Sequence, residues 1–166
     1  GTPESILVIN SDVTERKNSE AALLAQRERF RTLVETTSAI LWEGDPATFS
    51  ITFVNKEAEK VLGYPVEMWT SDPGFWAEHI YPPDREWAVN YCLTATNRCE
   101  EHSFEYRMIA ADGRIVWLRD IVSVIAENGR PTKLVGVMVD ISREKLEEER
   151  LHAAFDSIPI GNIVID

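Results

Sequence analysis

One stretch of this sequence occurs twice, and the two copies lie close to the two ends of the chain. Residues 12–20 read DVTERKNSE and residues 140–148 read DISREKLEE, and each copy follows a short apolar run and opens a charged, helix-like segment. The segments 28–45 and 149–166 also align with each other without gaps. Self-similarity of this kind is typical of arrays of similar domains. We therefore expect one complete repeat, with the tail of a preceding copy and the head of a following one.

The repeat divides the chain into five expected segments. They are 1–12 for the tail of the preceding repeat, 13–36 for a linker helix, 37–142 for the central domain, 143–158 for an exit helix and 159–166 for the start of the next repeat. The linker lacks Pro and Gly and is rich in Glu, Arg, Ala and Leu, which favours a long helix.

The composition narrows the class of protein. With 28 Asp and Glu against 17 Lys and Arg, the formal net charge is −11. This balance argues against nucleic-acid binding and against docking on an anionic membrane. The apolar runs are far shorter than the ~20 residues of a membrane-spanning helix, so we expect no direct membrane contact. Cys92 and Cys99 lack a Cys-x-x-Cys spacing and are interpreted as reduced thiols of a cytoplasmic protein.

The central domain combines strand signals with helical segments. Asp112-Gly113 and Asn128-Gly129 are strong hairpin signals, and β-branched or alternating runs lie on both sides of them. The expected strands are 38–44, 50–54, 104–110, 115–126 and 132–141. We expect Asn55 to cap the helix that follows the second strand, and Gly63 to end that helix. The fold class is α+β, a five-stranded antiparallel sheet with short helices on one face.

Short motifs follow one another along this domain in a definite order. They are Phe53-Val54-Asn55, Leu62-Gly63-Tyr64, Tyr81-Pro82-Pro83-Asp84-Arg85, Phe104-Glu105-Tyr106-Arg107, Asp112-Gly113, Trp117, Val135-Gly136-Val137 and Asp140-Ile141-Ser142. Over residues 30–145 the ordered set resembles a PAS domain with a C-terminal PAC motif, of the kind found in multi-PAS, sensory box histidine kinase-like proteins of bacteria. The chain departs from that family at Tyr81, where His is usual, and at Ser142, where Thr is usual.

The resemblance implies a space between helices and sheet, in which relatives hold a flavin, a haem or a small organic ligand. The Asn-Cys-Arg-Phe context of flavin-adduct relatives is absent, and residues 84–98 lack the His that ligates haem in others. We therefore expect no cofactor, disfavour flavin and haem, and leave a small organic ligand open. Its candidate pocket residues are Trp76, His79, Tyr106 and Trp117. The alternative is that these large side chains only fill the core.

Asp140 and Ser142 are the candidates for signal coupling. Asp140 ends the last strand, Ser142 opens the exit helix, and both can make capping-type bonds to the backbone. No phosphate-binding loop or catalytic motif is present, so we do not expect an enzyme in this fragment. The resemblance predicts a sensory relay to a distal output domain, in most cases a histidine kinase. A diguanylate cyclase or phosphodiesterase output, or a passive dimerisation and protein-interaction spacer, stay open as alternatives.

The linker helices predict a homodimer. Leu23, Phe30 and Val34 lie at i, i+7 and i+11, which places them on one helical face that a lone helix could not bury. The linker after the first copy of the repeated stretch is one heptad longer than the linker after the second. Seven extra residues in an α-helix rotate the residues that follow by only ~20°, so both linkers present the same helical face. The other expected partners are the neighbouring repeats and the distal output domain.

Overall fold

The computed structural model describes residues 3–36 and 38–159, and the chain divides into two compact units, residues 1–37 and residues 38–166. The first unit is a single helix, α1 (Pro3–Thr36). It covers the expected linker helix, but it also includes residues 3–12, which the repeat aligns with the end of a PAS domain. A strand needs a neighbouring strand to take its backbone hydrogen bonds, and the described residues 3–36 of this unit contain none. The expected head of the next repeat, 159–166, lies almost wholly outside the described residues.

The second unit is built on an antiparallel sheet with the strand order β2-β1-β5-β4-β3. The strands are β1 (Ala39–Gly44), β2 (Ile51–Val54), β3 (His102–Ile109), β4 (Ile115–Glu127) and β5 (Arg130–Asp140). All five expected strands are present, and β1 pairs with β5 to close the sheet between the N-terminal hairpin and the C-terminal meander. The predicted fold class is therefore confirmed.

The two hairpin turns differ in length. Asn128 and Gly129 alone connect β4 to β5, with φ of 53° and 76°, as a two-residue turn of the hairpin type requires. The turn between β3 and β4 is longer. Gly113, with φ of 90°, donates its backbone N–H to the Ala110 carbonyl at 2.9 Å. Both Gly residues therefore occupy the left-handed backbone that their sequence context predicts.

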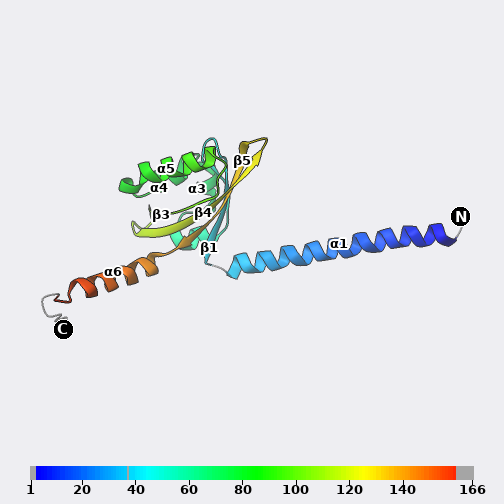
Figure 1. Ribbon diagram of the computed structural model, residues 1–166, viewed down its shortest axis with the longest axis horizontal. Helices are drawn as coiled ribbons and strands as arrows, with labels where there is room; N and C mark the ends of the chain where they lie inside the picture. Colours follow the sequence, from blue (N-terminus) through cyan, green and yellow to red (C-terminus); the bar gives the residue numbers. More distant parts are fainter. Residues whose placement is uncertain (1–2, 37, 160–166) are drawn as a thin grey trace, which may run out of the picture. The chain divides into compact units, whose positions relative to one another are not determined.

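Helices cover one face of the sheet, as Figure 1 shows for α3, α4 and α5. They are α2 (Glu57–Leu62), α3 (Val66–Ser71), α4 (Phe75–His79) and α5 (Pro82–Asn97), and α6 (Ser142–Asp156) follows β5. Gly63 ends α2 with φ of 80°, as expected. Asn55 does not cap α2, because its side chain accepts the Leu41 N–H and donates to the Ala39 carbonyl, and so binds the adjacent strand β1.

Strand alternation separates the helix-covered face of the sheet from the outer face. On β4, Val116, Leu118, Asp120 and Val122 are buried, and the residues between them are more exposed. Asp120 therefore occupies a core position among apolar side chains, with only 1% of its surface exposed. A carboxyl group at such a position needs hydrogen-bond partners inside the core.

Candidate functional site

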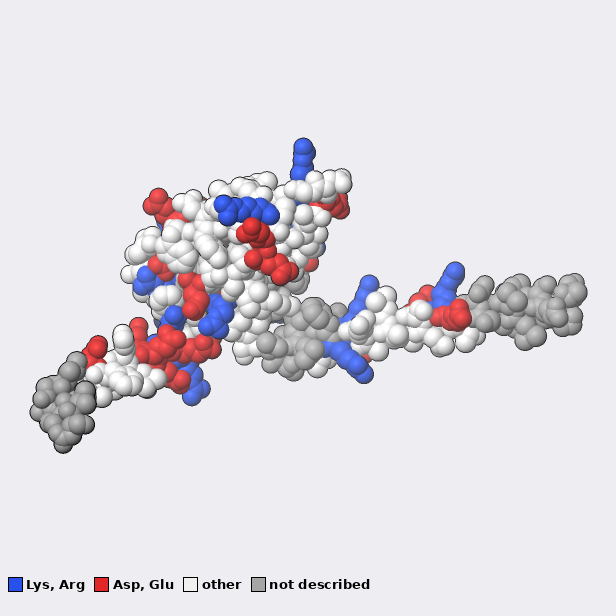
Figure 2. Space-filling view, viewed as in Figure 1, with Lys and Arg blue, Asp and Glu red and all other residues white. Residues whose placement is uncertain are grey.

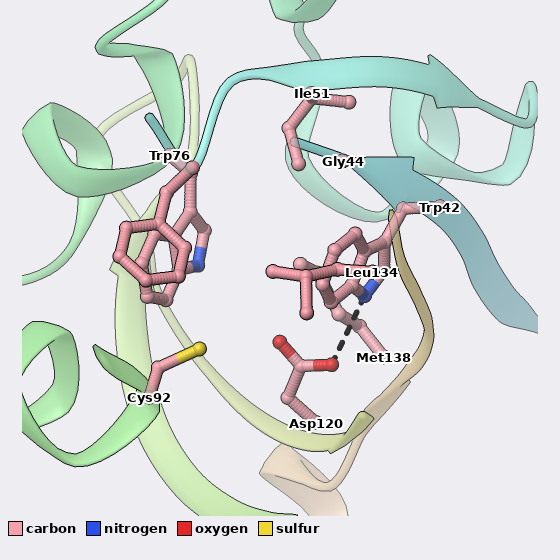
Figure 3. A pocket seen from close by; sticks show the side chains of 9 residues that line it. Trp42, Gly44, Ile51, Trp76, Cys92, Asp120, Leu134 and Met138 are labelled. Atoms are coloured by element: carbon pink, nitrogen blue, oxygen red, sulfur yellow. Dashed lines mark hydrogen bonds between the residues drawn. The ribbon is translucent and has the colours of Figure 1, made fainter. Parts of the chain in front are cut away.

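A small cavity lies between the helices and the sheet, and its volume is about 10 Å³. Figure 3 shows the side chains that surround it, with Asp120 and Cys92 approaching from opposite sides. The lining residues are Trp42, Gly44, Phe49, Ile51, Trp76, Cys92, Asp120, Leu134 and Met138. These residues come from both the helices and the sheet, so a rearrangement of the cavity would displace side chains of both.

Two indole N–H groups, one tyrosine hydroxyl and one carboxylate form a buried hydrogen-bonded chain beside the cavity. The Trp42 Nε1–H donates to Asp120 Oδ1 at 3.0 Å, and the Tyr106 hydroxyl donates to Asp120 Oδ2 at 3.0 Å. The Trp76 Nε1–H donates in turn to the Tyr106 hydroxyl at 2.8 Å. This chain connects α4, through Trp76, with strands β3, β4 and β1. Fully satisfied networks of this kind specify one packing of a core.

Burial raises the pKa of Asp120 to about 7, although the hydrogen bonds from Trp42 and Tyr106 act in the opposite direction. Within the described residues, no Lys, Arg or His forms an ion pair with this carboxyl group. The same burial raises the pKa of the Tyr106 hydroxyl well above its usual value, with the Asp120 charge as the second cause. Asp120 can therefore change its charge near neutral pH, whereas Tyr106 stays protonated.

Cys92 is not a nucleophile in this environment. Burial raises the pKa of its thiol to about 12, so the reactive thiolate is scarce at neutral pH. Its Sγ lies 3.3 Å from Nε2 of His102 and 3.9 Å from the Thr96 hydroxyl, within a largely apolar region. The described residues contain no group of three or more His, Cys, Asp or Glu side chains that could hold a metal ion.

Only part of the predicted pocket comes together at the cavity. Trp76 lines it, and Tyr106 contacts it through the bonds to Trp76 and Asp120. His79 does not, because its ring stacks on Phe75 at 4.0 Å and its Nδ1 lies 2.7 Å from the Phe75 carbonyl oxygen. His79 therefore lies apart from this cavity.

Trp117 also lies apart from the cavity. It lies between the buried residues Val116 and Leu118, so strand alternation directs it to the outer face of the sheet. Asp120, Trp42 and Cys92 also line the cavity, and none of them was predicted to do so. The available signal for Asp120 was its position in the same alternating series as Val116 and Leu118, where a charged residue is unusual.

Asp140 and Ser142 do attach the start of α6 to the sheet. The Asp140 Oδ1 accepts the Ser142 N–H at 2.9 Å, and the Ser142 hydroxyl accepts the Trp117 N–H at 3.0 Å. The Ile141 N–H donates to the Trp117 carbonyl at 2.9 Å. The last turn of chain before α6 is thus bonded to β4 as well as to β5. Whether these bonds transmit a signal stays a prediction.

The site does not fit a flavin or a haem. Ligand pockets commonly measure about 300–1,000 Å³, whereas this cavity has about 10 Å³. Helix α5 contains no His that could reach a haem iron. A small organic ligand would therefore require side chains such as Phe49 and Trp76, whose rings lie 6.0 Å apart, to move.

Across the described residues, no helix is long and apolar enough to cross a membrane.

Comparisons with known proteins agree with this architecture. Residues 51–138 match the family described as PAS fold. The N-terminal domain of a diguanylate cyclase with PAS/PAC sensor from Marinobacter aquaeolei has 34% identity and a TM-score of 0.60, over 64% of this chain and 98% of that one. A sensory box histidine kinase/response regulator from Burkholderia thailandensis E264 has 23% identity and a TM-score of 0.66, over 78% of this chain and 97% of that one.

The curated relatives are much longer than this chain. The "Probable diguanylate cyclase DgcE" of Escherichia coli (strain K12) is 26% identical over the whole of this chain, which corresponds to 16% of that protein. The chain spans less than a fifth of the length of the curated relatives it matches.

A five-stranded antiparallel sheet with helices on one face and a small aromatic cavity between them defines a sensor domain of the PAS class. The chain belongs to the PAS fold family.

Proposed function

We propose that this chain is a sensory relay within a longer signalling protein, in which a change at the cavity alters how the sheet holds α6. The supporting observation is the attachment of α6, which depends on Asp140, Ser142 and the backbone of Trp117. Two of these bonds are made to Trp117 of β4, the same strand that carries Asp120 to the cavity. A passive spacer would not need the exit helix to be bonded to a strand of the sensing site.

For the output domain we propose a diguanylate cyclase first and a histidine kinase second. The cyclase proposal is supported by two cyclase relatives, the N-terminal domain from Marinobacter aquaeolei at 34% identity and DgcE of Escherichia coli at 26% identity. The histidine kinase, which the sequence alone favoured, is supported by histidine kinase structures that are 26% and 23% identical to this chain. Assaying the full-length protein for cyclic di-GMP formation from GTP, and for autophosphorylation from ATP, separates the two outputs.

Replacing Asp140 with Ala should loosen α6 without unfolding the domain. Loss of a capping-type bond costs about 0.5–2 kcal/mol, whereas a domain is held together by roughly 5–15 kcal/mol. Amide hydrogens of residues 143–156 should therefore exchange faster in the variant, while those of the sheet stay protected. In the full-length protein, the output should lose its response to the input.

Asp112→Ala is the matched control for this experiment, because Asp112 Oδ1 accepts the Arg114 N–H at 3.0 Å in the same i, i+2 pattern, away from α6. It should leave the exchange of α6 unchanged. Equal exchange of α6 in Asp140→Ala and in the parent would show that this bond does not hold the helix, and the relay proposal would lose its main support.

We also propose that the chain forms a homodimer through its linker helices. Leu23 is 50% exposed on α1, and the side chains of Phe30 and Val34, the other members of the predicted stripe, lie outside the described residues. On α6, Leu151 and Phe155 are 60% and 67% exposed. Exposed apolar side chains four residues apart on a helix are typical of a helix-to-helix contact.

Deleting residues 1–28 should weaken self-association at least tenfold in sedimentation equilibrium, because the deletion removes most of α1. Exchanging both Leu151 and Phe155 for Ser tests α6 separately and leaves α1 intact. Dimerisation that survives the deletion and the double substitution together would place the interface elsewhere in the domain.

A further inference from the structure

A chain of charged and aromatic side chains connects α5 with α6 around the edge of β3. It begins at Asp84 in the first turn of α5, whose side chain is only 8% exposed. Asp84 Oδ2 accepts the Arg107 backbone N–H at 3.0 Å and the Arg107 Nε–H at 2.8 Å, and Asp84 Oδ1 accepts the Arg107 Nη2–H at 2.6 Å. The two-point contact sets the position and the plane of the guanidinium group.

The guanidinium of Arg107 lies against two aromatic rings. Its central carbon is 4.5 Å from the centre of the Tyr81 ring and 5.0 Å from the centre of the Trp117 ring. Both distances are within the ~6 Å over which a cation is attracted to a ring face. A movement of the start of α5 would therefore displace Arg107, and Arg107 would change its contact with Trp117.

Trp117 carries a second cation, which belongs to α6. The Lys145 Nζ lies 5.0 Å from the centre of the Trp117 ring and 3.3 Å from Glu105 Oε1. Glu105 also pairs with Arg119 at 3.5 Å, and Arg119 pairs with Glu144 of α6 at 3.5 Å. Figure 2 shows acidic and basic side chains interspersed where α6 leaves the sheet.

Trp117 connects α5 and α6 indirectly, because a side chain linked to each helix contacts its ring. Within the described part of the chain, no hydrogen bond, ion pair or ring contact joins α5 to α6 directly. Arg107, bonded to α5, and Lys145, on α6, both lie against the same indole ring. Because both ring distances are close to the outer limit of a cation–π contact, a shift of about 1 Å in either cation would weaken its contact substantially.

We propose that Trp117 transmits the position of α5 to the first turn of α6, through Asp84 and Arg107 on one side and Lys145 on the other. The inference rests on the proposed relay function and assigns that function a route outside the core. Helix α5 also supplies Cys92 to the cavity wall, so a rearrangement of the cavity reaches this route through the same helix. Asp84, Arg107, Trp117 and Lys145 are positioning residues.

Hydrogen exchange in the intact 166-residue chain tests this route. Asp84→Asn should accelerate exchange of the amides of residues 143–147 by about fivefold, the lower end of coupling between distinct sites, although Asp84 does not contact α6. Asp112→Asn is the matched control, because Asp112 also binds the backbone N–H and the Nε–H of one arginine, Arg114. The control should leave α6 unchanged.

The effect should depend on Trp117. The Trp117→Leu variant is measured first, to give its own exchange rates for the amides of α6. Adding Asp84→Asn to this variant should then change the exchange of residues 143–147 by less than twofold. If Asp84→Asn does not fold, Arg107→Lys replaces it, since this change keeps the charge and removes the two-point contact. An undiminished effect in the Trp117→Leu background, or no effect of either variant in the parent, overturns the proposal.

Coupling must also act in the reverse direction, because linkage between two sites is reciprocal. Lys145→Gln on the surface of α6 should therefore also accelerate exchange of the Arg107 amide, which donates to Asp84. An unchanged Arg107 amide would overturn the route through Trp117. The cyclase and kinase assays and the Asp140→Ala result would be unaffected, so this failure is distinct from a failure of the proposed function.

Discussion

Replacing Gly136 with Ala is expected to lower the free energy of unfolding by about 3 kcal/mol, the upper part of the range for overpacked cores. Gly136 lies on β5 between Trp42 of β1 and Val122 of β4. A Cβ at this position would overlap Cε2, Cζ2 and Nε1 of the Trp42 indole. The ring is 5% exposed and its Nε1–H is bonded to Asp120, so it cannot move without breaking that bond. Urea unfolding measures the loss.

A double-mutant cycle with Trp42→Phe isolates this contact. Phe lacks the indole atoms that the new methyl group would overlap, so Gly136→Ala should cost much less in the Trp42→Phe background than in the parent. Contacting residues commonly show interaction energies of about 0.5–3 kcal/mol. Strictly additive losses would show that the overlap with Trp42 is not the cause of the destabilisation.

The fold could be predicted from the sequence because its signals are local. The residues of each hairpin are close in sequence, and Asn128-Gly129 forms the two-residue turn that such a pair favours. The alternation in β3 likewise separates buried Tyr106 from more exposed Arg107. The helical start of α1 was not predicted, because residues 1–12 were assigned to the tail of a preceding repeat, whereas the structure has residues 3–12 in one helix with the linker.

The cavity was harder to predict because it depends on contacts between distant residues. Trp42 and Asp120 are 78 positions apart, and nothing near either residue in the sequence indicates the other. Composition suggested an aromatic pocket but did not say which rings face it. For Trp117, alternation with Val116 and Leu118 indicates the outer face of the sheet, which residue type alone does not.

Stability of the parent protein is expected to fall between about pH 4 and pH 7 relative to an Asp120→Asn variant. The pKa of Asp120 is raised from 3.8 to about 7, chiefly by burial, so the folded state binds this proton more tightly than the unfolded chain. The resulting stabilisation is complete below the unfolded pKa and is lost as the pH rises through the folded pKa. Three pKa units correspond to about 4 kcal/mol. Asn, like the protonated acid, carries no charge to bury.

Urea unfolding of both proteins from pH 4 to pH 8 tests this expectation, because the other carboxyl groups contribute equally and cancel in the difference. The parent-minus-variant difference should decrease by up to about 1.4 kcal/mol per pH unit and become constant above pH 7. Cys92 and Tyr106 keep their protons over this range, since burial raises both of their pKa values. A difference that stays constant from pH 4 to pH 8 would mean that Asp120 is ionised in the core throughout, and that its hydrogen bonds from Trp42 and Tyr106 offset the desolvation of its charge.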